Sequence, residues 1–252
     1  MSRDGSHRAR VALTTGIVTS VAVIGLAWAG WRLSNSRSYQ LFGQLVTRVD
    51  TEDSVVALTL DDGPLPVYTD SVLHILGDSN VHATFFAVGA ALVDHLDLGR
   101  RIVQEGHELG NHSYTHHRLV FKTPGYIRHE VEGTDSLIRA AGERGAIHFR
   151  PPYGKRLVML PWFLSRSGRI TVLWDVEPDT YPGIARDPTK IVEYVVNHAR
   201  PGSIILLHTE TAGRAPARAA LPRLIGALRA AGYQFVTVSE LMRHRGSHKR
   251  AA

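Results

Sequence analysis

The amino-acid sequence predicts an α/β fold in which parallel strands are covered by helices. Strand-like apolar runs alternate with amphipathic stretches from Ser54 onward, and several of these runs end in charged or polar residues. Sustained alternation of this kind is typical of a parallel sheet, either closed into a barrel or open and doubly wound. No GxGxxG or Walker loop follows any run, so the sequence does not indicate nucleotide binding.

The expected strands are short and rich in β-branched or aromatic residues. They cover residues 55–60, 83–88, 108–110, 147–150, 170–174, 203–207 and 234–238. The stretches between them carry apolar residues at helical spacing. The expected helices cover residues 68–77, 92–105, 126–141, 157–167, 188–199 and 218–231.

An apolar segment precedes this alternating region. Residues 11–31 carry no charge, follow the basic residues 1–10, and are long enough to cross a bilayer as a helix. We therefore expect a single-pass membrane anchor with a cytoplasmic N-terminus and an extracytoplasmic domain. The alternative is a signal peptide, because Ala27-Trp28-Ala29 has the A-x-A pattern of a cleavage site and would release a secreted protein.

Charge and composition limit the function classes. The formal net charge is +6, yet residues 1–38 and 243–252 each carry a net +4, which leaves −2 for the middle of the chain. Basic charge confined to the tails does not favour a nucleic-acid-binding face. The absence of cysteine excludes disulfides, thiolate metal sites and cysteine nucleophiles. We expect residues 32–53 to be a linker, 54–242 the folded domain and 243–252 a basic tail.

Two adjacent carboxylates form the first functional signal. Asp61 and Asp62 end the expected strand 55–60 and precede Gly63-Pro64. The carboxyl ends of strands are where α/β barrels place their active sites. Neighbouring carboxylates repel each other unless a cation or a basic residue separates their roles. The alternative is a surface turn punctuated by glycine and proline.

Two histidines form the second signal. His112 and His116 follow the expected strand 108–110, and their spacing of four predicts that both lie on one side of a helical turn. Together with one Asp they would make a three-ligand metal site that leaves positions open for water and substrate. Non-haem iron oxygenases use the same donor set, but typically on β-sandwich frames, which the strand–helix alternation disfavours. We expect His117 to be solvated or to lie behind the ligands.

Two more strand ends carry candidate residues. Arg150 opens a rigid Arg-Pro-Pro turn and could pair with a carboxylate that a metal does not use. His208 ends an apolar run and is an acid/base candidate. Without partners, each residue would have only a structural role.

In this order, residues 59–64, 112–116, 150–154 and 206–208 resemble the motifs of the polysaccharide deacetylase family, also called the NodB homology domain or carbohydrate esterase family 4. Residues 68–89 are similar to that family as well, and the resemblance extends over residues 55–241. It implies a distorted, incomplete (β/α) barrel of about seven parallel strands. It also implies hydrolysis of N-acetyl groups from amino sugars in a polymer.

The resemblance assigns a metal site and a base. It implies that Asp62, His112 and His116 bind a divalent metal, with Zn²⁺ expected and Co²⁺ or another divalent ion as alternatives. It implies that Asp61 is the catalytic base and that Arg150 orients it. The two neighbouring carboxylates would then have separate roles.

The resemblance also implies how the rest of the site works. The backbone N–H of Tyr153 would bind the oxyanion, and His208 would be the catalytic acid. The expected substrate pocket is formed by Pro152, Tyr181 and Leu206.

One segment departs from the family pattern, which has an Asp followed four residues later by a Trp. The resemblance places Glu177 at the acidic position and Tyr181 at the position of the Trp. Glu177 is therefore the expected partner of His208. Asp175 and Asp179 are the alternatives if the loop is shifted.

The expected function is a metal-dependent hydrolase that removes N-acetyl groups from an extracellular polysaccharide. Peptidoglycan is the first candidate, and a chitooligosaccharide or another surface polysaccharide is the alternative. A catalytically weak wall-binding protein of the same fold is the alternative from a different class. We expect a membrane contact through the N-terminal helix and no nucleic-acid partner, and the sequence predicts no oligomeric state.

Overall fold

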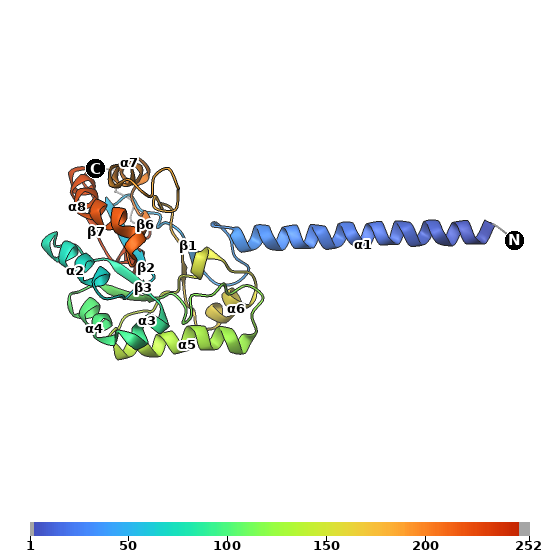
Figure 1. Ribbon diagram of the computed structural model, residues 1–252, viewed down its shortest axis with the longest axis horizontal. Coiled ribbons are helices and arrows are strands. Elements are labelled where there is room, and N and C mark those ends of the chain that lie inside the picture. Colours follow the sequence, from blue (N-terminus) through green and yellow to red (C-terminus); the bar gives the residue numbers. More distant parts are fainter. Residues whose placement is uncertain (1–2, 247–252) are drawn as a thin grey trace.

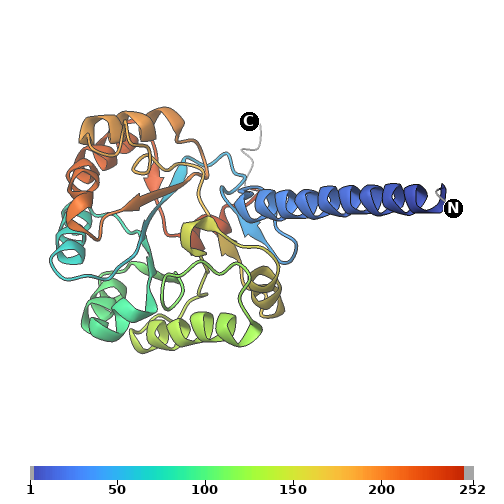
Figure 2. The same cartoon turned by 45° about the vertical axis from the view of Figure 1, so that its right-hand side comes forward.

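The computed structural model describes residues 3–246 (Figure 1). A long helix, α1 (Arg3–Asn35), projects from a domain that contains the remaining elements. Within the described part of the chain, none of the helices combines the length and the hydropathy that a membrane span requires. The domain itself is a sheet of parallel strands with helices around it, as the second view shows (Figure 2).

Strand β2 (Val55–Asp61) lies at the centre of the larger sheet. It pairs with β6 (Ile204–His208) on one side and with β3 (Thr84–Ala87) on the other. Strand β4 (Glu108–Asn111) lies beyond β3, and β7 (Gln234–Phe235) pairs with the beginning of β2. Every one of these pairings is parallel, so the predicted α/β fold with parallel strands is confirmed.

A second, two-stranded sheet joins the two sides of the larger one. Strand β1 (Leu45–Val46) pairs in parallel with β5 (Thr171–Val172). Single bridges connect Phe149 to β4 and to β5, and another connects Val176 to β6. The expected strand 147–150 is reduced to the bridge at Phe149. The strands therefore form a distorted ring in which isolated bridges replace parts of regular strands.

Helices cover the outside of this ring (Figure 2). The expected helix 92–105 is two helices, because the chain bends at His95, which has φ −136° and ψ 49°. The expected strand 234–238 ends early, because Thr237 caps a further helix. The helices after α1 are α2 (Tyr68–Asp78), α3 (Gly89–Asp94), α4 (Leu96–Gln104), α5 (Pro124–Ala140), α6 (Met159–Arg166), α7 (Pro188–His198), α8 (Ala215–Ala230) and α9 (Val238–Arg243).

Strand β2 is buried at every position because both of its faces are covered. Val56, Leu58 and Leu60 pack in the cluster that includes the inner faces of the helices. The alternating positions Val55 and Ala57 pack in a second cluster inside the ring. Because side chains alternate along a strand, Asp61 shares the inner side with these residues. The strand thus delivers a carboxylate to the interior end of the ring.

The expected linker 32–53 contains structure of its own. It includes β1, and Val46 and Val49 are both buried. The packed part of the chain therefore begins before residue 54, because these apolar side chains contribute to the core. At the other end, α9 reaches Arg243, and residues 247–252 of the expected basic tail lie outside the described residues.

Candidate active site

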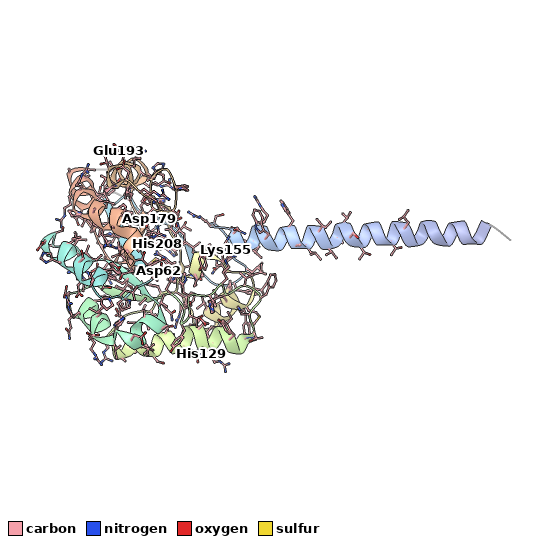
Figure 3. All side chains as sticks on the ribbon, in the orientation of Figure 1. Asp62, His129, Lys155, Asp179, Glu193 and His208 are labelled. Carbon is pink, nitrogen blue, oxygen red and sulfur yellow. The ribbon has the colours of Figure 1, made fainter. Side chains whose placement is uncertain are left out.

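The candidate residues meet at the carboxyl ends of the parallel strands. Asp61 and His208 end neighbouring strands and lie opposite each other in the register of β2 and β6. His112 directly follows β4. Figure 3 labels Asp62, His208 and Asp179 close together near the middle of the domain. The sheet therefore brings these side chains together at one edge.

Asp62, His112 and His116 converge on one point. Asp62 Oδ1 lies 3.1 Å from Nε2 of His116 and 3.6 Å from Nε2 of His112. One donor atom from each of the three side chains lies within 4.8 Å of the others. Asp62 itself has φ 80°, a left-handed conformation that Asp tolerates better than most residues. The predicted trio is thus assembled.

The two histidines are not on a helical turn, which corrects the expectation from their spacing. They lie on the loop that follows β4, and the rings pack with their centroids 4.9 Å apart. Ser113 and His116 have φ values of 68° and 58°. These left-handed residues turn the loop back on itself, which brings the imidazoles together without a helix.

Glu130, on α5, holds this loop. Its buried carboxylate accepts hydrogen bonds from the backbone N–H groups of Tyr114 and Thr115, at 3.0 and 2.9 Å. It also accepts one from the hydroxyl of Thr115, at 2.7 Å. Three hydrogen bonds to one buried carboxylate are strong and directional. Glu130 therefore fixes the backbone that carries His116, although nothing in the sequence pattern singled it out.

The trio fits a divalent metal. Asp62 Oδ1 is buried and accepts no well-oriented hydrogen bond from any described residue. Nδ1 of His112 donates to the carbonyl oxygen of Arg150 at 2.8 Å, which leaves the lone pair of Nε2 facing the site. Burial lowers the pKa of His112, and this favours the neutral imidazole that binds metals.

The charge balance at Asp62 points in the same direction. Burial alone would raise the pKa of Asp62. The close approach of His116 Nε2, at 3.1 Å, and then the charges of His112 and His208 outweigh burial and hold this pKa well below its usual value. The surroundings of Asp62 therefore favour its ionised form, which is the form that binds a metal.

Asp61 is paired with Arg150 instead. Nη1 of Arg150 donates to Asp61 Oδ1 at 2.6 Å, and both side chains are almost completely buried. The guanidinium also donates to Thr59 Oγ1 and to the carbonyl oxygen of Leu173, and it stacks on Phe86 at 4.0 Å. This arrangement fixes the orientation of the Asp61 carboxylate.

His208 has an acidic partner, Asp179. Both carboxylate oxygens of Asp179 lie 3.3 Å from Nδ1 of His208, and one of them accepts the backbone N–H of His208 at 2.6 Å. Burial opposes protonation of this imidazole, but the hydrogen bond and charge of Asp179, followed by Asp61 and Asp62, raise the pKa of His208 to about 9. The imidazole is therefore cationic at neutral pH and can donate a proton.

Glu177, the expected partner of His208, is directed elsewhere. It accepts a hydrogen bond from Nε1 of Trp174 at 2.7 Å and pairs with Nη2 of Arg37 at 2.9 Å. Asp175, the other alternative, binds Ser203 Oγ and the backbone N–H of Ile204, so it holds the start of β6. Asp179 alone of the three acidic residues reaches His208.

The metal-ligand trio, Asp61 and His208 surround one cavity of about 350 Å³. Tyr153 lies at its mouth, where its exposed ring packs against His116 with 5.0 Å between centroids. Pro152, Leu206 and Tyr181, expected to form the pocket, are not among its walls; the first two are buried, and Tyr181 packs on Tyr194. The walls are Arg37, Asp61, Asp62, His112, His116, Tyr153, Trp174, Glu177, Thr180, His208 and Arg214.

Two cationic residues of this cavity were not expected from the sequence. Arg37 lies in the range that was expected to be a linker, and Arg214 lies on a short 3₁₀ helix, η2 (Ala212–Arg214). Neither belongs to a motif or ends a strand, so no local signal marks them. Both become visible only once the chain is folded.

Comparisons with known proteins identify relatives of this chain. The family described as polysaccharide deacetylase matches residues 48–166. A peptidoglycan-N-acetylglucosamine deacetylase of Bacillus cereus is 32% identical over 204 residues, which are 81% of this chain and 95% of that protein. A chitooligosaccharide deacetylase of Sinorhizobium fredii is 38% identical over 201 residues, which are 75% of this chain and 92% of that protein.

A solved structure extends the similarity to the fold. The crystal structure of a peptidoglycan N-acetylglucosamine deacetylase superimposes with a TM-score of 0.75 and 27% sequence identity. The match covers 81% of this chain and 95% of the other. With the motifs, the site geometry and these relatives in agreement, the chain belongs to the polysaccharide deacetylase family.

Proposed function

We propose that the protein removes N-acetyl groups from amino sugars of peptidoglycan, with a divalent metal as cofactor. The observation that carries this proposal is the placement of three kinds of group around one cavity. These are a metal-ligand trio, an oriented carboxylate at Asp61 and a cationic imidazole at His208. In metal-assisted hydrolysis of an amide, such groups activate water, accept its proton and protonate the leaving nitrogen.

Asp62, His112 and His116 would hold the metal. One carboxylate and two imidazoles suit Zn²⁺, and they also suit Co²⁺ and related ions. When bound, such an ion lowers the pKa of water and polarises an acyl oxygen. Three protein ligands leave room for both water and substrate, as catalytic sites require.

The other residues handle protons and position. Asp61, oriented by Arg150, accepts the proton of the water that attacks the acetyl carbonyl. The backbone N–H of Tyr153 would donate to the carbonyl oxygen as it gains negative charge. His208 donates a proton to the sugar nitrogen when the carbon–nitrogen bond breaks. The products are acetate and a free amino sugar.

The test is acetate release by the full-length protein from purified peptidoglycan and from chitooligosaccharides, each with added Zn²⁺. Release from peptidoglycan is expected, and His208→Ala should abolish it. Release from chitooligosaccharides alone would favour the substrate of the Sinorhizobium relative instead. No release from either substrate would refute a deacetylase and favour a catalytically weak wall-binding protein.

We further propose that the domain works outside the cytoplasm, either anchored through residues 11–31 or released by cleavage near Ala29. Apolar side chains on several sides of α1 support this proposal, since Val18, Leu26 and Trp28 are 67%, 74% and 61% exposed. Fractionation of cells and the mass of the mature chain would test it. A mature chain that begins at Gly30 would exclude the anchor, and a protein confined to the cytoplasm would exclude both forms.

A further inference from the structure

Arg37 reaches the active site from outside the strands and loops that build it. It lies just beyond α1, yet its side chain is one of the walls of the catalytic cavity. Nη2 donates to Oε2 of Glu177 at 2.9 Å, and the guanidinium lies over the ring of Trp174 at 5.0 Å. The side chain is still 53% exposed. Arg37 is therefore oriented by the protein and open to a ligand.

Arg156 fixes the segment that carries Arg37 to residues 150–154, the turn that contains Arg150 and Tyr153. Arg156 is 1% exposed and donates to the carbonyl oxygens of Ser36 and Tyr39, at 2.6 and 3.0 Å. It also donates to the side chain of Gln40 and to the carbonyl oxygen of Gly154. A buried guanidinium with this many partners fixes geometry. The position of Arg37 relative to the cavity is therefore set by the fold.

Positive charge gathers around the mouth of the cavity. Arg118 lies over the ring of Tyr153 at 5.1 Å, and Arg214 is a wall of the cavity. Lys155 lies between the labelled catalytic residues and the end of α1 (Figure 3). Burial lowers the pKa of Lys155, and the charges of Arg118 and Arg37 lower it further. These cations are close enough to repel one another.

The nearby carboxylates already have partners, which are Arg150 for Asp61 and the proposed metal for Asp62. Glu177 is paired with Arg37, and Asp179 is shared between His208 and Arg214. Within residues 3–246, Arg118 and Lys155 have no ion pair with a carboxylate, and only Nη2 of Arg37 has a hydrogen-bond acceptor. Nε and Nη1 of Arg37 can therefore serve a ligand. An anionic group on the substrate would find donors and net positive potential here.

We propose that Arg37 binds a carboxylate of the substrate polymer near the N-acetylated sugar, and so makes the enzyme prefer an anionic glycan to a neutral one. This inference rests on the proposed deacetylase function and adds the chemical class of the substrate. Either Nε–H or Nη1–H of the guanidinium can donate a charge-assisted hydrogen bond to a carboxylate. Peptidoglycan carries free carboxylates on its peptide stems and on any lactyl group that bears no stem, whereas a chitooligosaccharide carries none.

The experiment compares kcat/KM for two N-acetylated oligomers of equal length, a neutral chitooligosaccharide and a carboxylate-bearing peptidoglycan fragment. The full-length protein, Arg37→Gln, Arg37→Lys and Arg128→Gln are measured. Arg128 is an exposed residue of α5 that lies outside the cavity, so it is the matched control. Thermal unfolding of each variant checks that the fold is retained.

Arg37→Gln should lower the ratio of kcat/KM for the anionic over the neutral oligomer about tenfold, chiefly through KM; this factor corresponds to ~1.4 kcal/mol. Arg37→Lys should restore part of the ratio, added salt should reduce it in the unmodified protein, and Arg128→Gln should not alter it. An equal loss on both oligomers, or no loss on the anionic one, would overturn the inference but leave the deacetylase function intact. No activity of the unmodified protein on either oligomer would instead refute the proposed function.

Discussion

The pKa of His208 gives the most direct test of the proposed mechanism, through Asp179→Asn. The carboxylate of Asp179 contacts Nδ1 of His208 at 3.3 Å and is the main group that raises the pKa of His208 to about 9. A bound divalent ion would offset the contribution of Asp62, which leaves Asp179 more important still. An opposite charge at this distance shifts a pKa by roughly one to three units.

The sign follows from the role of the imidazole. His208 must be protonated to act as an acid, so activity should persist below its pKa and fall as the pH rises through it. Because Asp179→Asn removes the negative charge but keeps an acceptor oxygen, the pKa of His208 should fall. The alkaline limb of kcat against pH should then move down by about one to two pH units, toward the ordinary histidine value of ~6.5.

The assay is acetate release over a pH range with the metal concentration held constant. Glu177→Gln is the matched control, because Glu177 also lines the cavity but contacts Arg37 and Trp174 rather than His208. It should leave the alkaline limb in place. If Asp179→Asn left the limb unchanged, or if Glu177→Gln moved it instead, the assignment of Asp179 as the partner of His208 would be wrong.

Four other substitutions separate metal binding, catalysis and stability. Asp61→Asn should retain metal, measured by elemental analysis, but its kcat should fall roughly 10²–10⁴-fold. His112→Ala should lose both metal and activity. Full turnover by Asp61→Asn would exclude Asp61 as the base. Glu130→Gln should weaken metal affinity about tenfold in a chelator competition, because it loosens the loop that carries His116, and unchanged affinity would contradict this. Arg150→Met should lower the free energy of unfolding, measured in urea, by about 3–5 kcal/mol, because it leaves Asp61 buried without its partner. A decrease below about 1 kcal/mol would contradict this role of Arg150.

The strands and their polar ends could be predicted because the signals are local. The apolar run that ends at Asp61 and the run that ends at His208 are adjacent in the structure, where parallel pairing brings their ends together. The expected strand 147–150 shows the limit of such signals. Phe149 makes single bridges to both neighbours, but the distortion of the ring prevents a longer strand. The available pairing partners, rather than the strand propensity of residues 147–150, therefore determine how much strand forms in this segment.

The details of the site depended on backbone turns that spacing does not reveal. A separation of four between His112 and His116 suggested a helical turn, yet a loop with left-handed residues brings the imidazoles equally close. The choice between Glu177 and Asp179 also depended on the path of the loop. These residues are only two apart in sequence, but they face Arg37 and His208 respectively.

The N-terminal connection has the largest consequence for function. Arg37 and Glu177 are 140 residues apart, so no local pattern could have joined them. Their pairing, with Arg156 holding the neighbouring backbone, makes the chain just after α1 part of the catalytic cavity. Cleavage near Ala29 would still leave this stretch attached to the domain, so both proposed forms, anchored and released, retain Arg37. Substrate selection by Arg37 would therefore be the same on the membrane surface and in the secreted protein.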